Sequence, residues 1–276
     1  MPHLATEVDC FSLVIEIGGI PIRVNTASQE FLRTLQVRYA GFIGSQDGTW
    51  DSLPQMEFDV ELSDAGFGNP EAGVKVSQTD GIWHMQRGDF HAEWEPKTRH
   101  GKIRQSANPY SIDAILRIVH TLALARQGGM LLHAASAIHH GNACVFAGVS
   151  GAGKTTISRL APRDVTLLTD EISYVRKIDS GYVCFGTPFT GELAKLGENV
   201  SGPLEAVYLL AQGPENKIEP VPVPDAVRSV LANVLFFAED PELVRQVFHS
   251  VCELVDRVPV SRLTFVPDSR VWEMIR

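Results

Sequence analysis

The chain has 276 residues, of which 44% are hydrophobic and 21% are charged, and its formal net charge is −9 at pH 7. These shares are typical of a folded globular protein and argue against disorder. The acidic balance argues against broad nucleic-acid binding, which depends on basic side chains that neutralise phosphates. The sequence contains neither a signal-peptide pattern nor an apolar run of the ~20 residues that a membrane span needs, so we expect a cytoplasmic protein without membrane partners.

Short β-like runs separated by turn residues dominate the first 105 residues. Residues 11–24 predict a hairpin around Gly18-Gly19, because glycine accepts the positive φ of a tight turn. A basic stretch from Lys97 to Arg104 indicates a solvated strand and turn, with a contact surface for an acidic partner as the alternative. Further strands are predicted at Met56–Leu62, Gly73–Ser77, Gly81–Gln86 and Phe90–Trp94. We therefore expect a smaller, mainly β domain over residues 1–105.

From residue 106 the pattern changes to alternating strands and helices. Ser111–Gln127 predicts a helix with Ser111 as N-cap and Gly128 as its stop. Later strands are predicted at Met130–Ile138, Ala143–Ala147, Val165–Thr169, Tyr182–Phe185, Ala206–Ala211 and Ser261–Val266, and later helices at 154–161, Ala226–Ala238 and Pro241–Val255. The four cysteines show no metal-ligand spacing, and Cys144, in an apolar strand, is expected to be a buried thiol. The fold class is therefore α/β, with a second domain over residues 106–276.

Residues 148–155 match the phosphate-binding pattern G-x-x-x-x-G-K-[ST] between a predicted strand and a predicted helix. Its glycines let backbone N–H groups turn toward anionic oxygens, Lys154 would bridge the β- and γ-phosphates, and the Thr155 hydroxyl would hold Mg²⁺. The expected cofactors are ATP and Mg²⁺. The expected nucleotide-binding residues are Gly148, Val149, Ser150, Gly151, Ala152, Gly153, Lys154, Thr155 and Thr156. The alternative is a structural glycine turn with a solvated lysine.

Two acids, Asp170 and Glu171, end the apolar strand that begins at Val165. Ligands of open α/β sheets bind at such strand ends, and adjacent strand residues face opposite ways, so one of the two acids is expected to point at the metal. A solvated strand end is the alternative. Because only 16 residues separate Lys154 from Asp170, we expect this strand to lie close to the strand that precedes the loop.

Two further segments have both a functional and a structural interpretation. His133 lies in an apolar strand, where a histidine is usually part of the core, but near a phosphate it could orient a carboxylate. The segment Gly186–Glu192 contains two glycines and a proline, and it is either an ordinary turn or a constrained substrate or metal loop that involves Thr187 and Glu192.

Four segments taken in order, 131–137, 148–156, 167–171 and 186–192, resemble the HPr kinase/phosphorylase-like kinases and, more remotely, the ATP-dependent phosphoenolpyruvate carboxykinases. The likeness is strongest to HPr-kinase-related proteins of bacterial gene clusters, including kinases that modify lasso peptides. Those proteins share runs similar to 203–210 and 258–265. The resemblance covers about residues 130–276. Residues 1–105 lie outside it, and for that reason we expect this region to help recognise the substrate. A segment like the HPr kinases' Glu-Ile-Arg-Gly motif is absent from the sequence, which argues against HPr itself as the substrate.

This resemblance implies that a phosphoryl group is transferred from ATP to a hydroxyl, typically that of a serine. It places His133 beside the active centre, Lys154 on the phosphates, and Thr155 and Asp170 at Mg²⁺. Either Asp170 or Glu171 would accept the proton of the hydroxyl. The acceptor is a protein, a peptide or a small molecule, and homo-oligomers are known in the family. The alternative hypothesis is a non-catalytic nucleotide-binding module that regulates a partner.

Overall fold

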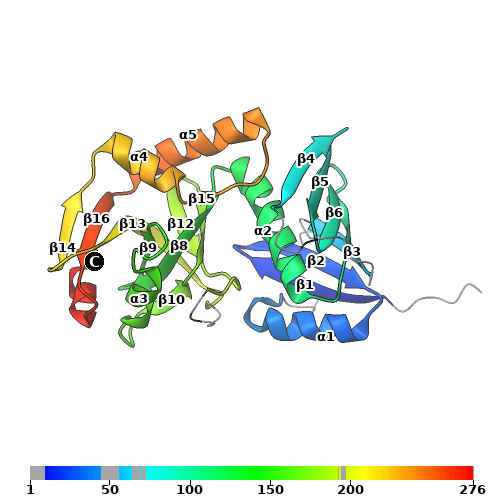
Figure 1. Ribbon diagram of the computed structural model, residues 1–276, viewed down its shortest axis with the longest axis horizontal. Coiled ribbons are helices and arrows are strands. Elements are labelled where there is room, and N and C mark those ends of the chain that lie inside the picture. Colours follow the sequence, from blue (N-terminus) through cyan, green and yellow to red (C-terminus); the bar gives the residue numbers. More distant parts are fainter. Residues whose placement is uncertain are drawn as a thin grey trace, which may run out of the picture. The chain divides into compact units, whose positions relative to one another are not determined.

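The computed structural model describes residues 10–44, 56–63, 69, 73–191, 193 and 197–275. The chain divides into two compact units, Met1–Leu116 and Arg117–Arg276. One sheet belongs to each unit, and helices accompany both sheets (Figure 1). The chain is therefore a mixed α/β protein, as the sequence predicted.

The first unit contains a seven-stranded sheet in the order β1-β2-β3-β7-β6-β5-β4. Its strands are β1 (Phe11–Ile17), β2 (Ile20–Thr26), β3 (Met56–Leu62), β4 (Lys75–Thr79), β5 (Ile82–Arg87), β6 (Phe90–Glu95) and β7 (His100–Gln105). The pairs β2–β3 and β3–β7 are parallel, and the other pairs are antiparallel. The predicted hairpin around Gly18-Gly19 is confirmed, since both glycines have positive φ. The basic stretch lies partly in the turn before β7 and partly in β7 itself, where the exposed Lys102 and Arg104 alternate with buried residues, as the strand-and-turn interpretation predicted.

Helix α1 (Gln29–Arg38) follows β2 and was not predicted, because its apolar positions are few. Ser28 caps it, with the Phe31 N–H donating to the Ser28 hydroxyl at 3.2 Å, and Phe31, Leu32 and Leu35 form its buried face. A single 3₁₀ turn, η1 (Ala40–Phe42), ends this segment.

Helix α2 (Pro109–Ala125) begins two residues before the predicted start. Ser111 is therefore not its N-cap: this side chain is buried, and its hydroxyl donates to Asp89 at 2.7 Å. The helix breaks off before Gly128, which has a positive φ, as the sequence indicated.

The second unit contains a mixed sheet, built around the long strand β8. Its strands are β8 (Met130–His139), β9 (Asn142–Ala147), β10 (Thr166–Thr169), β11 (Ile172–Ile178), β12 (Gly181–Phe185), β13 (Ser201–Gln212), β14 (Lys217–Pro220), β15 (Val234–Leu235) and β16 (Val260–Phe265). Strand β13 is parallel to both β9 and β16. The first half of β8 pairs with β11 and β15, and its second half with β10 and β9. The partners of β8 therefore change between His133 and Ala134.

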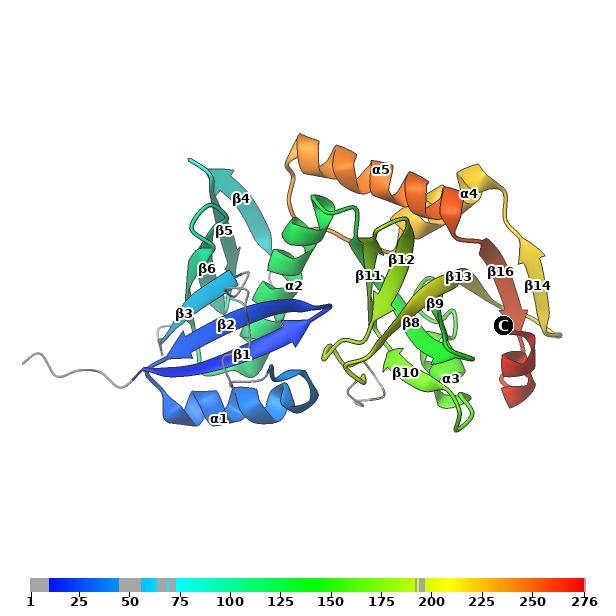
Figure 2. The same cartoon turned by 180° about the vertical axis from the view of Figure 1, so that it is seen from behind.

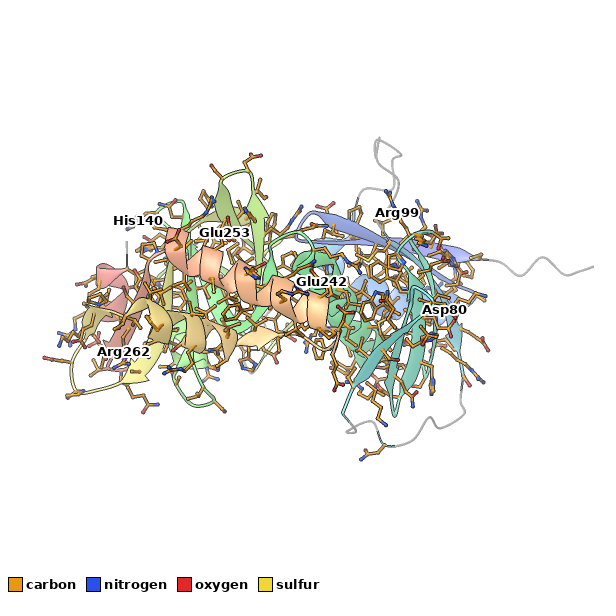
Figure 3. The ribbon with its side chains drawn as sticks, turned by 90° about the horizontal axis from the view of Figure 1, so that it is seen from above. Asp80, Arg99, His140, Glu242, Glu253 and Arg262 are labelled. Carbon is orange, nitrogen blue, oxygen red and sulfur yellow. The ribbon has the colours of Figure 1, made fainter. Side chains whose placement is uncertain are left out.

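Helices cover both faces of this sheet (Figures 1 and 2). On one face, α4 (Val223–Leu231) and α5 (Pro241–Arg257) bury Ala226, Val230, Val251 and Leu254 against the strands. Figure 3 shows two acids of α5, Glu242 and Glu253, and Glu253 forms an ion pair with Lys177 of β11. On the other face, α3 (Lys154–Arg159) and the 3₁₀ helix η2 (Ser269–Met274) pack Ile157, Val271 and Trp272 into a second cluster. Cys144 is buried there, as predicted, and burial raises its pKa to about 12.

Turns and helix ends explain where the sequence-based boundaries were right or wrong. A turn joins the predicted strands 130–138 and 143–147: His140, labelled in Figure 3, and Gly141 both have positive φ, as in a type I′ hairpin. The predicted helix Ala226–Ala238 is too long, since α4 ends at Leu231 and β15 follows. Strand β10 is not beside β9, because β8 lies between them.

Candidate functional site

The glycine-rich loop 148–153 connects β9 to α3, and glycine is required in it for identifiable reasons. Gly151 and Gly153 have φ values of 79° and 112°, which residues with a Cβ rarely adopt. A Cβ on Gly153 would lie 2.7 Å from the Phe265 ring, and one on Gly148 would lie 2.8 Å from the Cβ of Ala152. Strand β16, which carries Phe265, therefore packs directly under the loop.

This loop forms one side of a cavity of about 610 Å³ in the second unit. The cavity is lined by His133, Gly148, Val149, Ser150, Gly151, Gly153, Lys154, Thr155, Thr156, Asp170, Glu171, Gly191, Ala232, Asn233, Val234 and Leu235. Of the predicted nucleotide-binding residues, Ala152 is not in the lining, because its side chain packs into the core cluster under the loop. The structure thus brings together the loop, both acids and His133, which the sequence places on three separate segments.

Lys154 reaches back over the loop that precedes it. Its Nζ donates to the Gly148 carbonyl oxygen at 2.7 Å and to the Val149 carbonyl oxygen at 3.4 Å. Loss of surrounding water lowers the pKa of Lys154, while the negative charge of Glu171 acts in the opposite direction. The ammonium group is therefore partly desolvated and lies at the loop, where an anion would interact strongly with it.

Asp170 and Glu171 lie at the break between β10 and β11, and their surroundings differ. Asp170 is only 4% exposed, and its two carboxylate oxygens accept the N–H groups of Gly191 and Leu193, each at 2.9 Å. Glu171 is half-buried and interacts electrostatically with Lys154. Asp170 therefore holds the backbone of Gly191 and of Leu193, while Glu171 interacts with the charge of Lys154 at the loop.

The break itself is held by a hydroxyl group. The Thr169 Oγ1 accepts the N–H groups of both Glu171 and Ile172 at 3.2 Å, which fixes the bend that carries the two acids. Gly191 packs against both acids: a Cβ there would lie 2.9 Å from the Asp170 Oδ2 and 3.1 Å from the Glu171 Cβ. The two acids are therefore placed by local hydrogen bonds and by close backbone approach.

His133 lies directly opposite Ile172 on the neighbouring strand, and its side chain is exposed to the cavity. It is therefore not a core histidine. Desolvation by the cavity walls is the largest of the effects that lower its pKa, and the positive charges of Lys154 and Arg117 add to it. The imidazole therefore favours its neutral form, which can both donate and accept a hydrogen bond.

The segment 186–191 closes behind the acids rather than lining the cavity with polar side chains. Thr187 is fully buried, and its hydroxyl donates to the Ile172 carbonyl oxygen at 2.9 Å, outside the cavity lining. Phe189 is buried under the guanidinium of Arg117, whose Cζ is 4.8 Å from the ring centroid. Glu192, the other predicted residue of this segment, lies outside the described residues.

Sequence reasoning missed two parts of the site. The segment 232–235 lines the cavity although it belonged to a predicted helix; an asparagine followed by β-branched and aromatic residues is a stop signal that could have indicated the change. Gln212, at the end of β13, donates from its Nε2 to the Gly151 carbonyl oxygen at 2.7 Å. No pattern in the sequence indicates that contact, because it joins residues 61 positions apart.

Within the described part of the chain, three or more His, Cys, Asp or Glu side chains do not gather anywhere as a metal-ligand set. The cavity instead offers the Thr155 hydroxyl and the Asp170 and Glu171 carboxylates, which suits an ion that takes part of its ligands from a phosphate. No helix in that part is long and apolar enough to cross a membrane.

The fold and the cavity define an α/β protein with a glycine-loop site that combines a lysine, two acids and a histidine. The model of the family described as SynChlorMet cassette protein ScmC matches residues 104–276. This match spans more than half of the chain, and the chain belongs to that family.

Two further comparisons complete this result. None of the curated proteins matches the chain. Among solved structures, the Hpr(Ser) kinase/phosphatase from Coxiella burnetii matches at 9% sequence identity, over 49% of this chain and 84% of that one, with a TM-score of 0.26. A TM-score this low carries no argument about function, so a functional conclusion has to come from the site itself.

Proposed function

We propose that this protein is an ATP- and Mg²⁺-dependent kinase that transfers the γ-phosphoryl group to a hydroxyl, that of a serine of a protein or peptide. The observation that carries the proposal is the meeting of a partly desolvated Lys154 with Asp170 and Glu171 in one glycine-loop cavity. A loop that only bound phosphate would need the lysine and the backbone amides but no carboxylates, which repel phosphate oxygens.

The residues present fit a nucleotide with its metal ion. The positive φ of Gly151 and Gly153 supports a loop whose N–H groups face an anion, and the Lys154 ammonium, now bonded to the Gly148 carbonyl, would move to the phosphates. Thr155 and Asp170 would hold Mg²⁺; each Asp170 oxygen keeps a second lone pair after accepting one N–H bond. When bound, Mg²⁺ supplies charge that offsets the β- and γ-phosphate oxygens.

Glu171 takes the role of proton acceptor in this proposal. The acceptor oxygen forms a bond to the γ-phosphorus while the bond from that phosphorus to the β,γ-bridging oxygen breaks, so that ADP leaves with the electron pair. The hydroxyl proton passes to the Glu171 carboxylate. Asp170 is less available for this role, because both of its oxygens already accept a backbone N–H.

In this proposal His133 orients a neighbouring group by a hydrogen bond and does not change its own charge. In its neutral form the imidazole can hold the acceptor hydroxyl or a carboxylate by a hydrogen bond without adding a charge. Its strand position, opposite the residue that follows Glu171, supports this role.

The two acids provide the test. We expect Glu171→Gln to reduce phosphoryl transfer by about a hundredfold, because the proton loses its acceptor, while the Kd of Mg²⁺-ATP stays within about twofold. Asp170→Asn should weaken Mg²⁺-ATP binding and lower the Tm, because an amide NH₂ would face a backbone N–H. Both are measured by calorimetric titration with ATP and by ATP consumption with lysate of the same organism as the acceptor source. Normal turnover in Glu171→Gln would contradict its role, and ATP binding without turnover under any condition would favour a binding module.

A further inference from the structure

The cavity wall that faces the glycine loop comes from four consecutive residues, 232–235, between α4 and α5. Asn233 is fixed there by three hydrogen bonds. Its N–H donates to the Val230 carbonyl at 2.9 Å, its Nδ2 donates to the Ser229 carbonyl at 2.8 Å, and its carbonyl accepts the His133 N–H at 2.7 Å. Its Oδ1 has no hydrogen-bond partner among the described residues and is not one of their buried unpaired atoms. The side chain therefore presents one accessible acceptor.

The backbone of β15 adds a donor and an acceptor next to that amide. Residues opposite each other in an antiparallel pair alternate between hydrogen-bonded and non-hydrogen-bonded positions. Because the His133 N–H bonds to Asn233, the next pair, Val234 and Leu132, is of the non-hydrogen-bonded kind. The N–H and C=O of Val234 therefore point away from β8. In the described part of the chain, β15 pairs with β8 alone, so this edge is open.

This wall differs chemically from the loop wall. The loop offers N–H donors and the Lys154 ammonium, which suit phosphate oxygens. The Asn233 Oδ1 cannot bind a phosphate oxygen, because both are acceptors. Residues 232–235 include no charged side chain, and Val234 and Leu235 contribute aliphatic surface. The wall therefore suits a neutral group that has its own N–H or O–H donor and some carbon surface.

The wall also lies on the reactive side of the cavity. At His133, β8 has Asn233 on one side and Ile172 on the other, and Glu171 directly precedes Ile172. Adjacent strands lie ~4.8 Å apart, so Asn233 is about two strand spacings from the bend that holds the acids. A group bound to the wall can therefore place a hydroxyl at Glu171.

We propose that residues 232–235 form the acceptor subsite and that the acceptor is an extended peptide carrying a serine or threonine. The peptide adds one strand residue to the open edge at Val234 and donates a hydrogen bond to the Asn233 Oδ1. Its aliphatic flank contacts Val234 and Leu235, and its hydroxyl reaches Glu171. This assignment rests on the proposed phosphoryl transfer. It adds that the acceptor hydroxyl belongs to an extended peptide that binds by strand addition.

The test uses the full chain with Mg²⁺ and radiolabelled ATP. The acceptor probe is a pool of N-acetylated, C-amidated heptapeptides with a central serine and random flanks; free serine and glycerol are the small-molecule probes. Asn233→Leu removes the acceptor atom and Val234→Pro removes the outward N–H, while Asn199→Leu is a matched control at an exposed asparagine. We expect the first two variants to lower kcat/KM for the pool about tenfold, with the Kd values of Mg²⁺-ATP and of tripolyphosphate within about twofold of wild type.

The remaining outcomes overturn the inference in distinguishable ways. Weaker binding of ATP but not of tripolyphosphate in Asn233→Leu would assign the wall to the nucleoside. Equal kcat/KM for free serine and the peptide pool, or wild-type ATP turnover without peptide labelling, would exclude the peptide and leave the kinase proposal intact. ATP that is bound but never consumed would contradict the proposed function itself. Thermal unfolding of each variant identifies misfolding, and if Val234→Pro is unfolded then Asn233→Leu decides.

Discussion

The two units of this protein use their buried charges differently. In the first unit, buried carboxylates are paired with arginines and hydroxyls: Asp113 with Arg38 and Tyr39, and Asp89 with Arg87 and Ser111. In the second, Lys154 is bonded to backbone carbonyls and Asp170 to backbone amides, at the rim of a cavity. Groups that neutralise one another contribute to stability, whereas charges held by the backbone keep their charge for a ligand.

The largest effect is expected at the cavity. Lys154→Met should lower phosphoryl transfer about a thousandfold, because the charge that develops on the transferred group loses its counter-charge. The Tm should fall little, because the hydrogen bonds of Lys154 are made to backbone carbonyls and its charged neighbour Glu171 is only half-buried. ATP consumption and thermal unfolding of the same preparation measure both. A large loss of stability would show that Lys154 is structural and would remove the contrast between the units.

The opposite result is expected at the buried pair of the first unit. Asp113→Leu leaves the Arg38 guanidinium and the Tyr39 hydroxyl without their carboxylate, and should cost about 3 kcal/mol in the free energy of unfolding. The Kd of Mg²⁺-ATP should not change. Glu93→Gln is the control: its partner His84 and Glu93 itself are both exposed, so we expect less than about 0.5 kcal/mol. Urea unfolding of both variants measures the two changes in the free energy of unfolding.

A pH-dependent difference is expected within the second unit. Burial lowers the pKa of His120 to about 3, and the positive charge of Arg176 adds to the shift. The Nδ1 of His120 lies 2.9 Å from the Tyr174 hydroxyl oxygen. The unfolded chain binds a proton here near pH 6.5 and the folded chain only near pH 3, so stability is complete at pH 7 and falls as the pH drops through this window.

At pH 4.5 this group alone should cost roughly 2 kcal/mol relative to pH 7. His120→Gln keeps a hydrogen-bonding side chain but cannot take the proton, so the pH 7 to pH 4.5 difference should shrink by that amount. His249→Gln, at an exposed position of α5, should keep the full wild-type difference. Urea unfolding at the two pH values measures the effect, and identical pH dependence in wild type and His120→Gln would refute the assignment.

The smallest effect is expected at the contact between β13 and the loop. Gln212→Ala removes the bond to the Gly151 carbonyl and should weaken Mg²⁺-ATP binding about threefold, because a neutral hydrogen bond at an exposed position contributes about 0.5–1 kcal/mol. Calorimetric titration measures it. Unchanged affinity would show that the glycines alone determine the shape of the loop.

Local patterns predicted those parts of the chain whose cause is local. The hairpin at Gly18-Gly19 and the turn at His140-Gly141 follow from residues that tolerate positive φ. The glycine loop between β9 and α3 was also placed correctly, since its strand and helix flank it directly in the sequence. The end of α4 was missed, because Val234 and Leu235 continue a helical apolar pattern and are held in β15 only by pairing with β8.

The candidate site also has features that the sequence indicated and features that only the tertiary structure decided. The sequence by itself indicated the groups to which we assign the proposed chemistry: motif and spacing pointed to Lys154, Asp170 and Glu171, and the family resemblance pointed to His133. The tertiary structure decided how they differ: the N–H groups of Gly191 and Leu193 hold the Asp170 carboxylate in place, whereas Glu171 interacts with the charge of Lys154. Only tertiary structure could bring Asn233 to the cavity, because that position depends on a strand pairing across about a hundred residues, which no local pattern encodes.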